Sequence, residues 1–354
     1  MSTLAPPPMT MIGAGDIAAE TDRHRPQLIE VVRAAYLAHD AGQSSNPHSS
    51  FLRFPHQNRS RIISLPAYLG GEFEVAGNKW IASFPDNTQH GIPRASATLI
   101  LNDCVTGYPF ACMESSIVSA TRTAASAVLG AQTLLGARRA RRVGIVGTGL
   151  IAQHVWRFLR DLDWEIDGFR LFDLDPAAAG RFGAVMAEHT EAEIVVADTV
   201  EDAFADCDLV LLTTVAGEPH LHDPRLLAHS PVVLHLSLRD LAPELILAAQ
   251  NFTDDVDHAV RERTSLHLTE QRTGNRDFVD GTLGDLLRGR MRRDHGRPAV
   301  FSPFGLGVLD LAVGKWVHDR VVAAGRGRRE SDFFTGARPG LACPSWTTRP
   351  FSRR

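Results

Sequence analysis

The residues of this sequence best suited to chemistry on an acidic substrate are four cations and one carboxylate: Arg53, Lys79, Arg94, Arg122 and Asp240. A planar guanidinium binds a carboxylate through two parallel hydrogen bonds. Only two of the 37 basic residues are lysines, so Lys79 stands out, because an ammonium is compact and loses its proton more readily than a guanidinium. We therefore expect the four cations to hold a small substrate that carries carboxylates.

Two of these cations lie in surroundings that favour a role beyond the surface. Arg122 is flanked by small residues near the start of an expected helix, where a buried guanidinium needs an anionic partner. This partner could equally well be a carboxylate of the substrate or a carboxylate of the protein itself, in an internal ion pair. Lys79 stands between Gly77 and the apolar Trp80 on an expected strand. These neighbours are equally consistent with a position of Lys79 in a binding site and with a structural role.

Asp240 follows the largely apolar run 232–238 and Arg239. If that run is a parallel strand, Asp240 lies outside its carboxyl end, where ligands bind in open α/β sheets. A carboxylate there could activate water or transfer protons. Capping the helix that follows is an equally consistent role. Nearby, we expect His235 to pack in the core and His220 and His222 to lie in solvent.

A glycine-rich turn must position these residues relative to a cofactor. Gly147, Gly149 and Ala152 form the pattern G-x-G-x-x-A between the apolar run 143–146 and an amphipathic segment. Such a strand, turn and helix bring the pyrophosphate of a dinucleotide to the N-terminus of the helix. The predicted cofactor-binding residues are Gly147, Thr148, Gly149, Leu150, Ile151, Asp173, Thr213 and Thr214.

Asp173 indicates which dinucleotide is bound. It ends the apolar run 169–172 and follows Gly149 by 24 residues, close to the spacing of about 20 residues for the acid that binds the adenosine ribose. Asp175 adds a negative charge, and no Arg or Ser stands where it would accommodate a 2′-phosphate. The sequence therefore predicts NAD rather than NADP as the cofactor. A structural turn without a ligand is the alternative.

The length of 354 residues suggests about two domains. Strands and helices alternate between residues 131 and 305, as in a doubly wound parallel sheet, whereas the segment before them contains an expected hairpin and a long Ala-rich helix. The predicted fold class is α/β, with a Rossmann doubly wound parallel sheet inserted into an α+β substrate-binding and dimerisation domain. The expected division is residues 1–130 with 306–325, residues 131–305, and a mobile tail at 326–354.

The composition excludes several functional classes. A net charge of −4 gives no sign of nucleic-acid binding, and no apolar run is long enough to span a bilayer. The four cysteines form no C-x-x-C pair and join no histidine cluster at metal-ligand spacing. The N-terminus lacks the pattern of a signal peptide. We therefore expect a cytoplasmic protein with reduced thiols and without a metal, a nucleic-acid partner or a membrane partner.

Taken together, the motifs resemble one family over most of residues 9–325. They are Gly77-Asn78-Lys79-Trp80, Leu101-Asn102-Asp103, Arg122-Thr123-Ala124-Ala125, Gly147-Thr148-Gly149, Phe172-Asp173 and Asp240. They are similar to those of the ornithine cyclodeaminase/μ-crystallin family. The resemblance implies a homodimer that binds NAD. It also implies that Arg53, Lys79 and Arg122 hold the α-carboxylate of an amino-acid substrate, and that Asp240, with Lys79, serves catalysis as the acid/base.

Within that family the chain looks most like the N-(2-amino-2-carboxyethyl)-L-glutamate dehydrogenases. The matching segments are residues 61–66, 79–81, 94–96 and 114–125. Leu238-Arg239 replaces the glycine pair that cyclodeaminases carry before the catalytic aspartate. The resemblance implies NAD-dependent cleavage to L-2,3-diaminopropionate and 2-oxoglutarate, a step toward siderophores or antibiotics. Because this substrate has three carboxylates, we expect Arg94 to bind an additional one.

Two other functions stay open at this point. One is a related enzyme: ornithine cyclodeaminase, or an amino-acid or ketimine dehydrogenase. The other is a non-enzymatic dinucleotide-binding protein, as μ-crystallins show that the fold can serve in this way. The presence of Lys79, Arg122 and Asp240 disfavours the binder, because binding a dinucleotide requires none of them.

Overall fold

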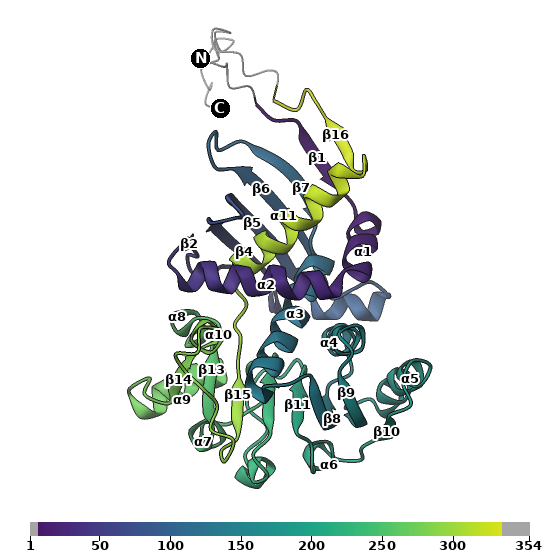
Figure 1. Cartoon of the computed structure of the whole chain (residues 1–354), viewed down its shortest axis with the longest axis vertical. Coiled ribbons are helices and arrows are strands. Elements are labelled where there is room, and N and C mark those ends of the chain that lie inside the picture. The colour runs from purple at the N-terminus through teal and green to yellow at the C-terminus, as the bar shows by residue number, and fades with distance from the viewer. Residues whose placement is uncertain (1–5, 335–354) are drawn as a thin grey trace, which may run out of the picture.

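The computed structural model describes residues 6–334, and two eight-stranded sheets organise them. One sheet lies above the other in Figure 1. The chain builds most of the upper sheet, then the whole lower sheet, and finally returns to the upper one. The structure is therefore α/β with an inserted parallel sheet, as the sequence predicts. In the described residues, no helix is sufficiently long and apolar to cross a bilayer.

The upper sheet is antiparallel except where β1 pairs with β7. β3 (Ser50–Phe54) pairs with β4 at its margin. The antiparallel pair β6–β7 confirms the hairpin expected from the sequence. The path of this sheet runs through β16 (Arg328–Glu330), β1 (Met9–Ile12), β7 (Pro109–Glu114), β6 (Ala95–Asp103), β5 (Val75–Ser83), β4 (Gln57–Leu69) and β2 (Ser44–Ser45).

One correction concerns the tail that we expected at residues 326–354. Residues 328–330 form β16, which pairs antiparallel with β1 at the edge of the upper sheet. Pairing satisfies backbone groups that an isolated edge strand would leave open, and no sequence pattern indicates it. The remainder of the expected tail, residues 335–354, lies outside the described part of the chain.

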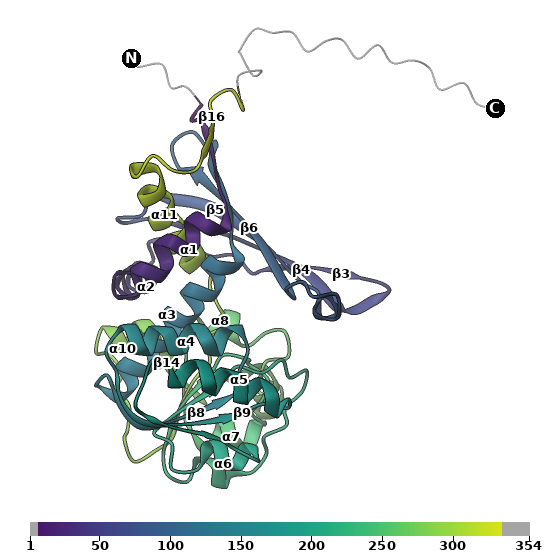
Figure 2. The same ribbon diagram turned by 90° about the vertical axis from the view of Figure 1, so that its right-hand side faces the viewer.

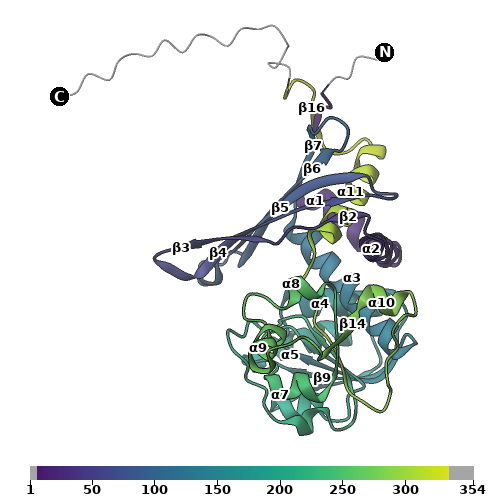
Figure 3. The same ribbon diagram turned by 90° about the vertical axis from the view of Figure 1, so that its left-hand side faces the viewer.

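Helices cover one face of the upper sheet, as Figures 2 and 3 show. In both views β3 and the adjoining part of β4 project beyond these helices. In β6, Leu99 and Leu101 are fully buried whereas Ile100 between them is exposed, as expected of a strand with one covered face. The helices of this part are α1 (Ala14–Arg23), α2 (Arg25–Asp40), α3 (Ser116–Leu135) and α11 (Gly307–Ala323).

The lower sheet is entirely parallel. All four residues of β11 and of β12 are buried, which fits a parallel sheet covered on both faces. Its order is β10 (Glu193–Val196), β9 (Glu165–Phe172), β8 (Arg139–Val146), β11 (Leu209–Leu212), β12 (Val232–His235), β15 (Ala299–Phe301), β13 (Gln250–Thr253) and β14 (Val279–Thr282).

Seven helices of the described residues connect these strands, and the polar segment 261–297 contributes two of them together with β14. The connecting helices are α4 (Leu150–Asp161), α5 (Pro176–Ala187), α6 (Val200–Phe204), α7 (Pro243–Ala248), α8 (Val256–Ala259), α9 (Ser265–Thr273) and α10 (Leu283–Leu287), with a short 3-10 turn at Pro224–Leu227. A second 3-10 turn, Pro85–His90, lies between β5 and β6 of the upper sheet.

Helix α3 joins the two sheets into one core. Its buried residues belong to a hydrophobic cluster that contains side chains from both sheets. Gly130 lies against Phe301 of β15, and a Cβ at this position would come within 2.6 Å of the ring carbon Cδ1. Phe301 is itself fully buried, so the ring has little room to move. The absence of a side chain at Gly130 therefore sets the distance between α3 and the lower sheet.

Substitution of Gly130 by alanine should destabilise the protein by about 1–3 kcal/mol, because the added methyl group overpacks the contact with Phe301. Gly180 in α5 is the matched control, since a Cβ there would meet no atom within 4 Å. Gly180→Ala should stabilise by up to about 1 kcal/mol through helix propensity. Urea unfolding measures both changes. Equal stability gains in the two variants would contradict the packing argument.

Candidate active site

The glycine turn lies at the carboxyl ends of β8, β9 and β11. Gly147 has a left-handed backbone (φ +86°), and a Cβ would lie 3.0 Å from the carbonyl of Thr213. The Thr213 hydroxyl donates to the Gly147 carbonyl at 2.6 Å. The backbone N–H and the hydroxyl of Thr148 both donate to Asp173, at 2.7 and 2.8 Å. The turn, the aspartate and Thr213 are therefore brought together as the sequence predicts.

These residues fit a dinucleotide. Gly149 is the N-cap of α4, yet a Cβ there would meet no protein atom within 4 Å. The space in front of the helix is open, no side chain caps it, and the following Leu150 is exposed. Burial alone would raise the pKa of Asp173, but the Thr148 and Asp175 N–H groups lower it, so the carboxylate is charged. An anionic pyrophosphate and a ribose would find matching groups here.

Asp240 is fully buried at the same edge of the sheet, just beyond β12. The Thr214 hydroxyl donates to its Oδ1 at 2.5 Å, and the Ser237 hydroxyl donates to Oδ2. The N-cap of α7 is Ala242, so Asp240 does not cap that helix. Thr214 directly follows Thr213 of the glycine turn. Through these adjacent threonines, the predicted acid/base lies next to the predicted cofactor site.

Two histidines lie beside Asp240. His235 is buried as expected; its Nε2 accepts from the Asp240 backbone N–H at 3.1 Å. His220 is exposed as expected, with a side chain 43% exposed, but its Nε2 lies 3.0 Å from Oδ1 of Asp240, a contact that the sequence did not indicate. Burial would raise the pKa of Asp240, but His235, Ser237 and Thr214 hold it well below the usual range. Asp240 is therefore a buried carboxylate that keeps its charge, and His220 connects it to the surface.

The second part of the site is a buried charge cluster under the upper sheet. Lys79 Nζ of β5 lies 2.6 Å from Asp310 Oδ2, and Arg122 Nε of α3 lies 3.1 Å from Asp310 Oδ1. Lys79 also donates to the Ser119 hydroxyl at 3.1 Å. Lys79 and Asp310 are almost completely buried. Two cations share one carboxylate, so the cluster keeps one positive charge for a further anion.

Asp310 is a functional residue that sequence reasoning missed. A signal was present, because Asp310 is the only charged residue in the apolar segment 307–314, and a buried carboxylate needs a partner. Burial lowers the pKa of Lys79 to about 8, with Asp310 opposing and Arg122 reinforcing that change. Lys79 is therefore charged at neutral pH but close to losing its proton.

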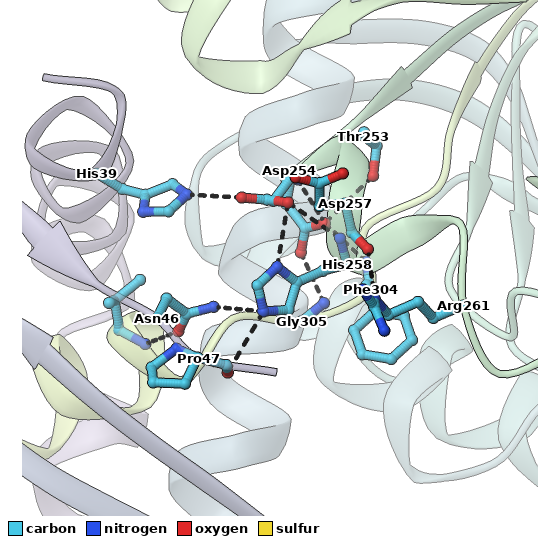
Figure 4. A network of polar contacts seen from close by, with 12 residues as sticks. His39, Asn46, Pro47, Thr253, Asp254, Asp257, His258, Arg261, Phe304 and Gly305 are labelled. Atoms are coloured by element: carbon cyan, nitrogen blue, oxygen red, sulfur yellow. Dashed lines mark hydrogen bonds and ion pairs between the residues drawn. The ribbon is translucent and has the colours of Figure 1, made fainter. Parts of the chain in front are cut away.

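A polar network beside this cluster ties the two sheets together (Figure 4). Asp254, fully buried after β13, accepts backbone N–H groups from Phe304 at 2.9 Å and Gly305 at 2.6 Å. Gly305 has a left-handed backbone (φ +99°), and a Cβ there would lie 2.6 Å from a guanidinium nitrogen of Arg122. Asn46, beside β2, approaches His258 of α8 with Nδ2 and Nε2 3.1 Å apart. The network therefore holds the loop against which Arg122 rests.

The remaining predicted cations lie outside the Asp310 cluster. Arg53 of β3 pairs with Glu262 at 2.7 Å, and its side chain is 59% exposed. Arg94 donates to the Ser83 hydroxyl at 2.8 Å. In the described residues Arg53 therefore has a different ion-pair partner from Lys79 and Arg122, and its grouping with them around a substrate stays a prediction. In residues 6–334 no group of three or more His, Cys, Asp or Glu side chains is arranged to hold a metal.

Replacement of Asp310 by asparagine should destabilise the protein by about 3–5 kcal/mol, because it leaves two cations buried together without an anion. Asp319→Asn is the control: Asp319 pairs with Lys315 on the same helix, but its side chain is 53% exposed. That change should cost less than about 1 kcal/mol. Chemical denaturation of the two variants compares them. Similar unfolding midpoints would contradict the charge-cluster argument.

Comparison with known proteins agrees with this geometry. The N-((2S)-2-amino-2-carboxyethyl)-L-glutamate dehydrogenase of Staphylococcus aureus is 26% identical over 321 residues, covering 88% of this chain and 95% of that protein. The structure of the Thermococcus litoralis Delta(1)-pyrroline-2-carboxylate reductase with NADH and L-proline has a TM-score of 0.82 at 22% identity, covering 90% and 99% of the two chains.

An archaeal alanine dehydrogenase dimer with bound NAD has a TM-score of 0.80 at 22% identity, covering 91% of this chain and 98% of that one. These two structures share the fold of this protein. The model of the ornithine cyclodeaminase/mu-crystallin family matches residues 10–325. The chain therefore belongs to the ornithine cyclodeaminase/mu-crystallin family, as the sequence resemblance predicts.

Proposed function

We propose that this protein is an NAD-dependent oxidoreductase that acts on a CH–NH bond. Its substrate is N-(2-amino-2-carboxyethyl)-L-glutamate, and its products are L-2,3-diaminopropionate and 2-oxoglutarate. The dehydrogenases and reductases with similar sequence and fold support the reaction class. The relative named for this substrate supports the finer assignment.

One observation carries the proposal: the buried cluster of Lys79, Arg122 and Asp310 keeps an uncompensated positive charge. A protein that only binds a dinucleotide gains nothing from a buried cation without an anion, because burying charge costs free energy. The carboxylate of an amino-acid substrate would neutralise this positive charge. We assign Lys79 and Arg122 to the α-carboxylate of the substrate.

The cofactor and the protein side chains perform different parts of the proposed reaction. Bound NAD would accept a hydride from the glutamate Cα, where the Cα–N bond becomes a protonated imine. Asp240 then takes a proton from the water that adds to the imine carbon and returns it to the nitrogen of the carbinolamine. The new hydroxyl group loses its proton to Asp240 as the C=O bond forms and the C–N bond breaks, which releases the amine and the keto acid. His220 exchanges this proton with solvent, because Asp240 itself is fully buried.

Purified protein incubated with NAD and N-(2-amino-2-carboxyethyl)-L-glutamate should form NADH, 2-oxoglutarate and L-2,3-diaminopropionate in equal amounts. Asp240→Asn should lower kcat by about 10²–10⁴-fold, as expected for loss of an acid/base, while NADH binding stays intact. His222→Gln, in the loop that carries His220, is the control, because His222 is exposed and pairs with Glu244.

Ornithine serves as the competing substrate in the same assay. Formation of proline and ammonia from ornithine without net NADH would make the protein a cyclodeaminase. NADH binding without turnover of either compound would make it a non-enzymatic binder. Either result would overturn the proposal.

The pKa of Lys79 predicts how activity depends on pH. Lys79 carries its charge below its pKa of about 8 and loses it as the pH rises through that value. Since kcat/KM reports the free enzyme, kcat/KM should fall above about pH 8. Lys79→Arg should remove this decline, because a guanidinium keeps its charge. Lys315→Arg on the exposed part of α11 should leave the profile unchanged, and a decline that persists in Lys79→Arg would contradict the assignment.

We propose that two copies associate through the uncovered face of the upper sheet. Met11, Trp80 and Ile100 of β1, β5 and β6 are each 39–45% exposed, an apolar grouping typical of an interface. Light scattering should give about twice the 38.6 kDa chain mass. Ile100→Glu should yield a single chain, whereas Val105→Glu at the exposed hairpin turn should not. A monomeric wild-type protein would exclude this dimer.

A further inference from the structure

A row of arginines crosses the projecting end of the upper sheet. Arg53 of β3 lies directly opposite Arg61 of β4, and Arg61 lies directly opposite Ser83 of β5. Arg94 reaches this row by its hydrogen bond to Ser83. Residues directly opposite in antiparallel strands share a face, and like charges in such pairs are destabilising. The row therefore requires an anion to offset it.

The edge of the lower sheet contributes one more arginine to this row. Arg239, which immediately precedes Asp240, donates from Nη2 to the Glu262 carbonyl at 2.7 Å. The Glu262 carboxylate in turn pairs with Arg53. Arg61 is therefore within reach of the charges of three other guanidinium groups and of the Glu262 carboxylate, which gives a net charge of about +3 if all are ionised. The arginine cluster, defined as Arg53, Arg61, Arg94 and Arg239, spans the two parts of the molecule beside the acid/base.

Arg61 is the member of the arginine cluster that lacks a partner. Its side chain is half-buried and, within the described residues, forms no hydrogen bond or ion pair. Burial lowers its pKa, and the charges of Arg239, Arg94 and Arg53 lower it further. A guanidinium has five N–H donors and no acceptor. An unpaired, half-buried Arg61 among like charges is therefore suited to receive a carboxylate from a ligand.

The row lies within reach of a ligand whose other end is bound by Lys79. Lys79 and Ser83 are four residues apart in β5, so they share a face. Their Cα atoms are separated by about 13 Å along an extended strand. Lys79 and Arg61 have long side chains that shorten this span from both ends. An extended substrate with carboxylates at both ends could contact both groups at once.

We infer that Arg61 and Arg239, together with Arg94, form the subsite for the side-chain carboxylate of the glutamate moiety. This inference rests on the proposed function and extends it to substrate selection. It also gives Arg239 a role, since Leu238-Arg239 replaces the glycine pair that cyclodeaminases carry at these positions. Ornithine offers an ammonium in place of this carboxylate, so the arginine cluster would repel it. Arg61 and Arg239 are thus determinants of substrate choice, and Asp240 and Lys79 serve the reaction itself.

The test compares the proposed substrate with its carboxamide, in which glutamine replaces the glutamate moiety. Arg61→Gln and Arg239→Gln should each raise KM for the carboxylate substrate by about 10- to 100-fold, the loss expected for one charge-assisted hydrogen bond. Their kcat/KM for the carboxamide should stay within about twofold of wild type. Arg59→Gln in the same strand is the control, because Arg59 pairs with Asp86 in solvent and is 73% exposed. The Kd for NADH should be the same in all variants.

Two outcomes would overturn the inference. Equal losses with both substrates would mean that the arginines support the fold, and unchanged KM would mean that they do not contact the substrate. Binding of glutarate, a simple dicarboxylate, can be measured by calorimetry. This measurement tests carboxylate binding by the arginines without depending on the reaction. If wild-type protein binds glutarate and Arg61→Gln does not, but no NADH forms, the subsite stands and the proposed function fails. If NADH forms and both proteins bind glutarate equally, the function stands and the subsite fails.

Discussion

Two buried cations share the carboxylate of Asp310, and this interaction sets the connectivity that the fold must have. Lys79 comes from β5, Arg122 from α3 and Asp310 from α11. A buried charge without a partner is strongly destabilising, so α11 must return to the upper sheet after the lower sheet is complete. The insertion of one sheet into the chain of the other is the arrangement that supplies the anion. It also leaves the single positive charge that an amino-acid substrate would neutralise.

The other part of the candidate site belongs to the lower sheet. The carboxyl edge of the lower sheet carries the glycine turn and Asp240, linked through Thr213 and Thr214. Gly130 and Phe301 fix α3 against that sheet, while Asp254 fixes the loop next to Arg122. Rigid packing matters here because substrate, hydride acceptor and proton acceptor must meet within hydrogen-bond distances. The arginine cluster then closes the same region from the projecting strands.

Local patterns were sufficient to predict the cofactor half of the site. The G-x-G-x-x-A turn and Asp173 depend on spacing within one βαβ unit, and the structure places them as expected. The partner of Lys79 could not be found in this way, because Asp310 is 231 residues away in sequence. The contact between His220 and Asp240 was missed for the same reason. That contact forms because the loop after β11 folds back toward Asp240, and no helix or strand periodicity in the sequence indicates such a fold. The opposition of Arg53 and Arg61 depends on strand register, which the sequence alone leaves open.

The proposed reaction requires hydride transfer from the glutamate Cα of N-(2-amino-2-carboxyethyl)-L-glutamate to bound NAD. This step can be followed with substrate deuterated at that carbon, by mass spectrometry of the reduced cofactor and comparison of initial rates. One deuterium should be transferred to the nicotinamide ring for each 2-oxoglutarate formed, together with a slower rate if hydride transfer limits turnover. Deuterium that appears in water or stays in the products would contradict the proposed reaction, because the C–N bond would then be broken without hydride transfer from that carbon.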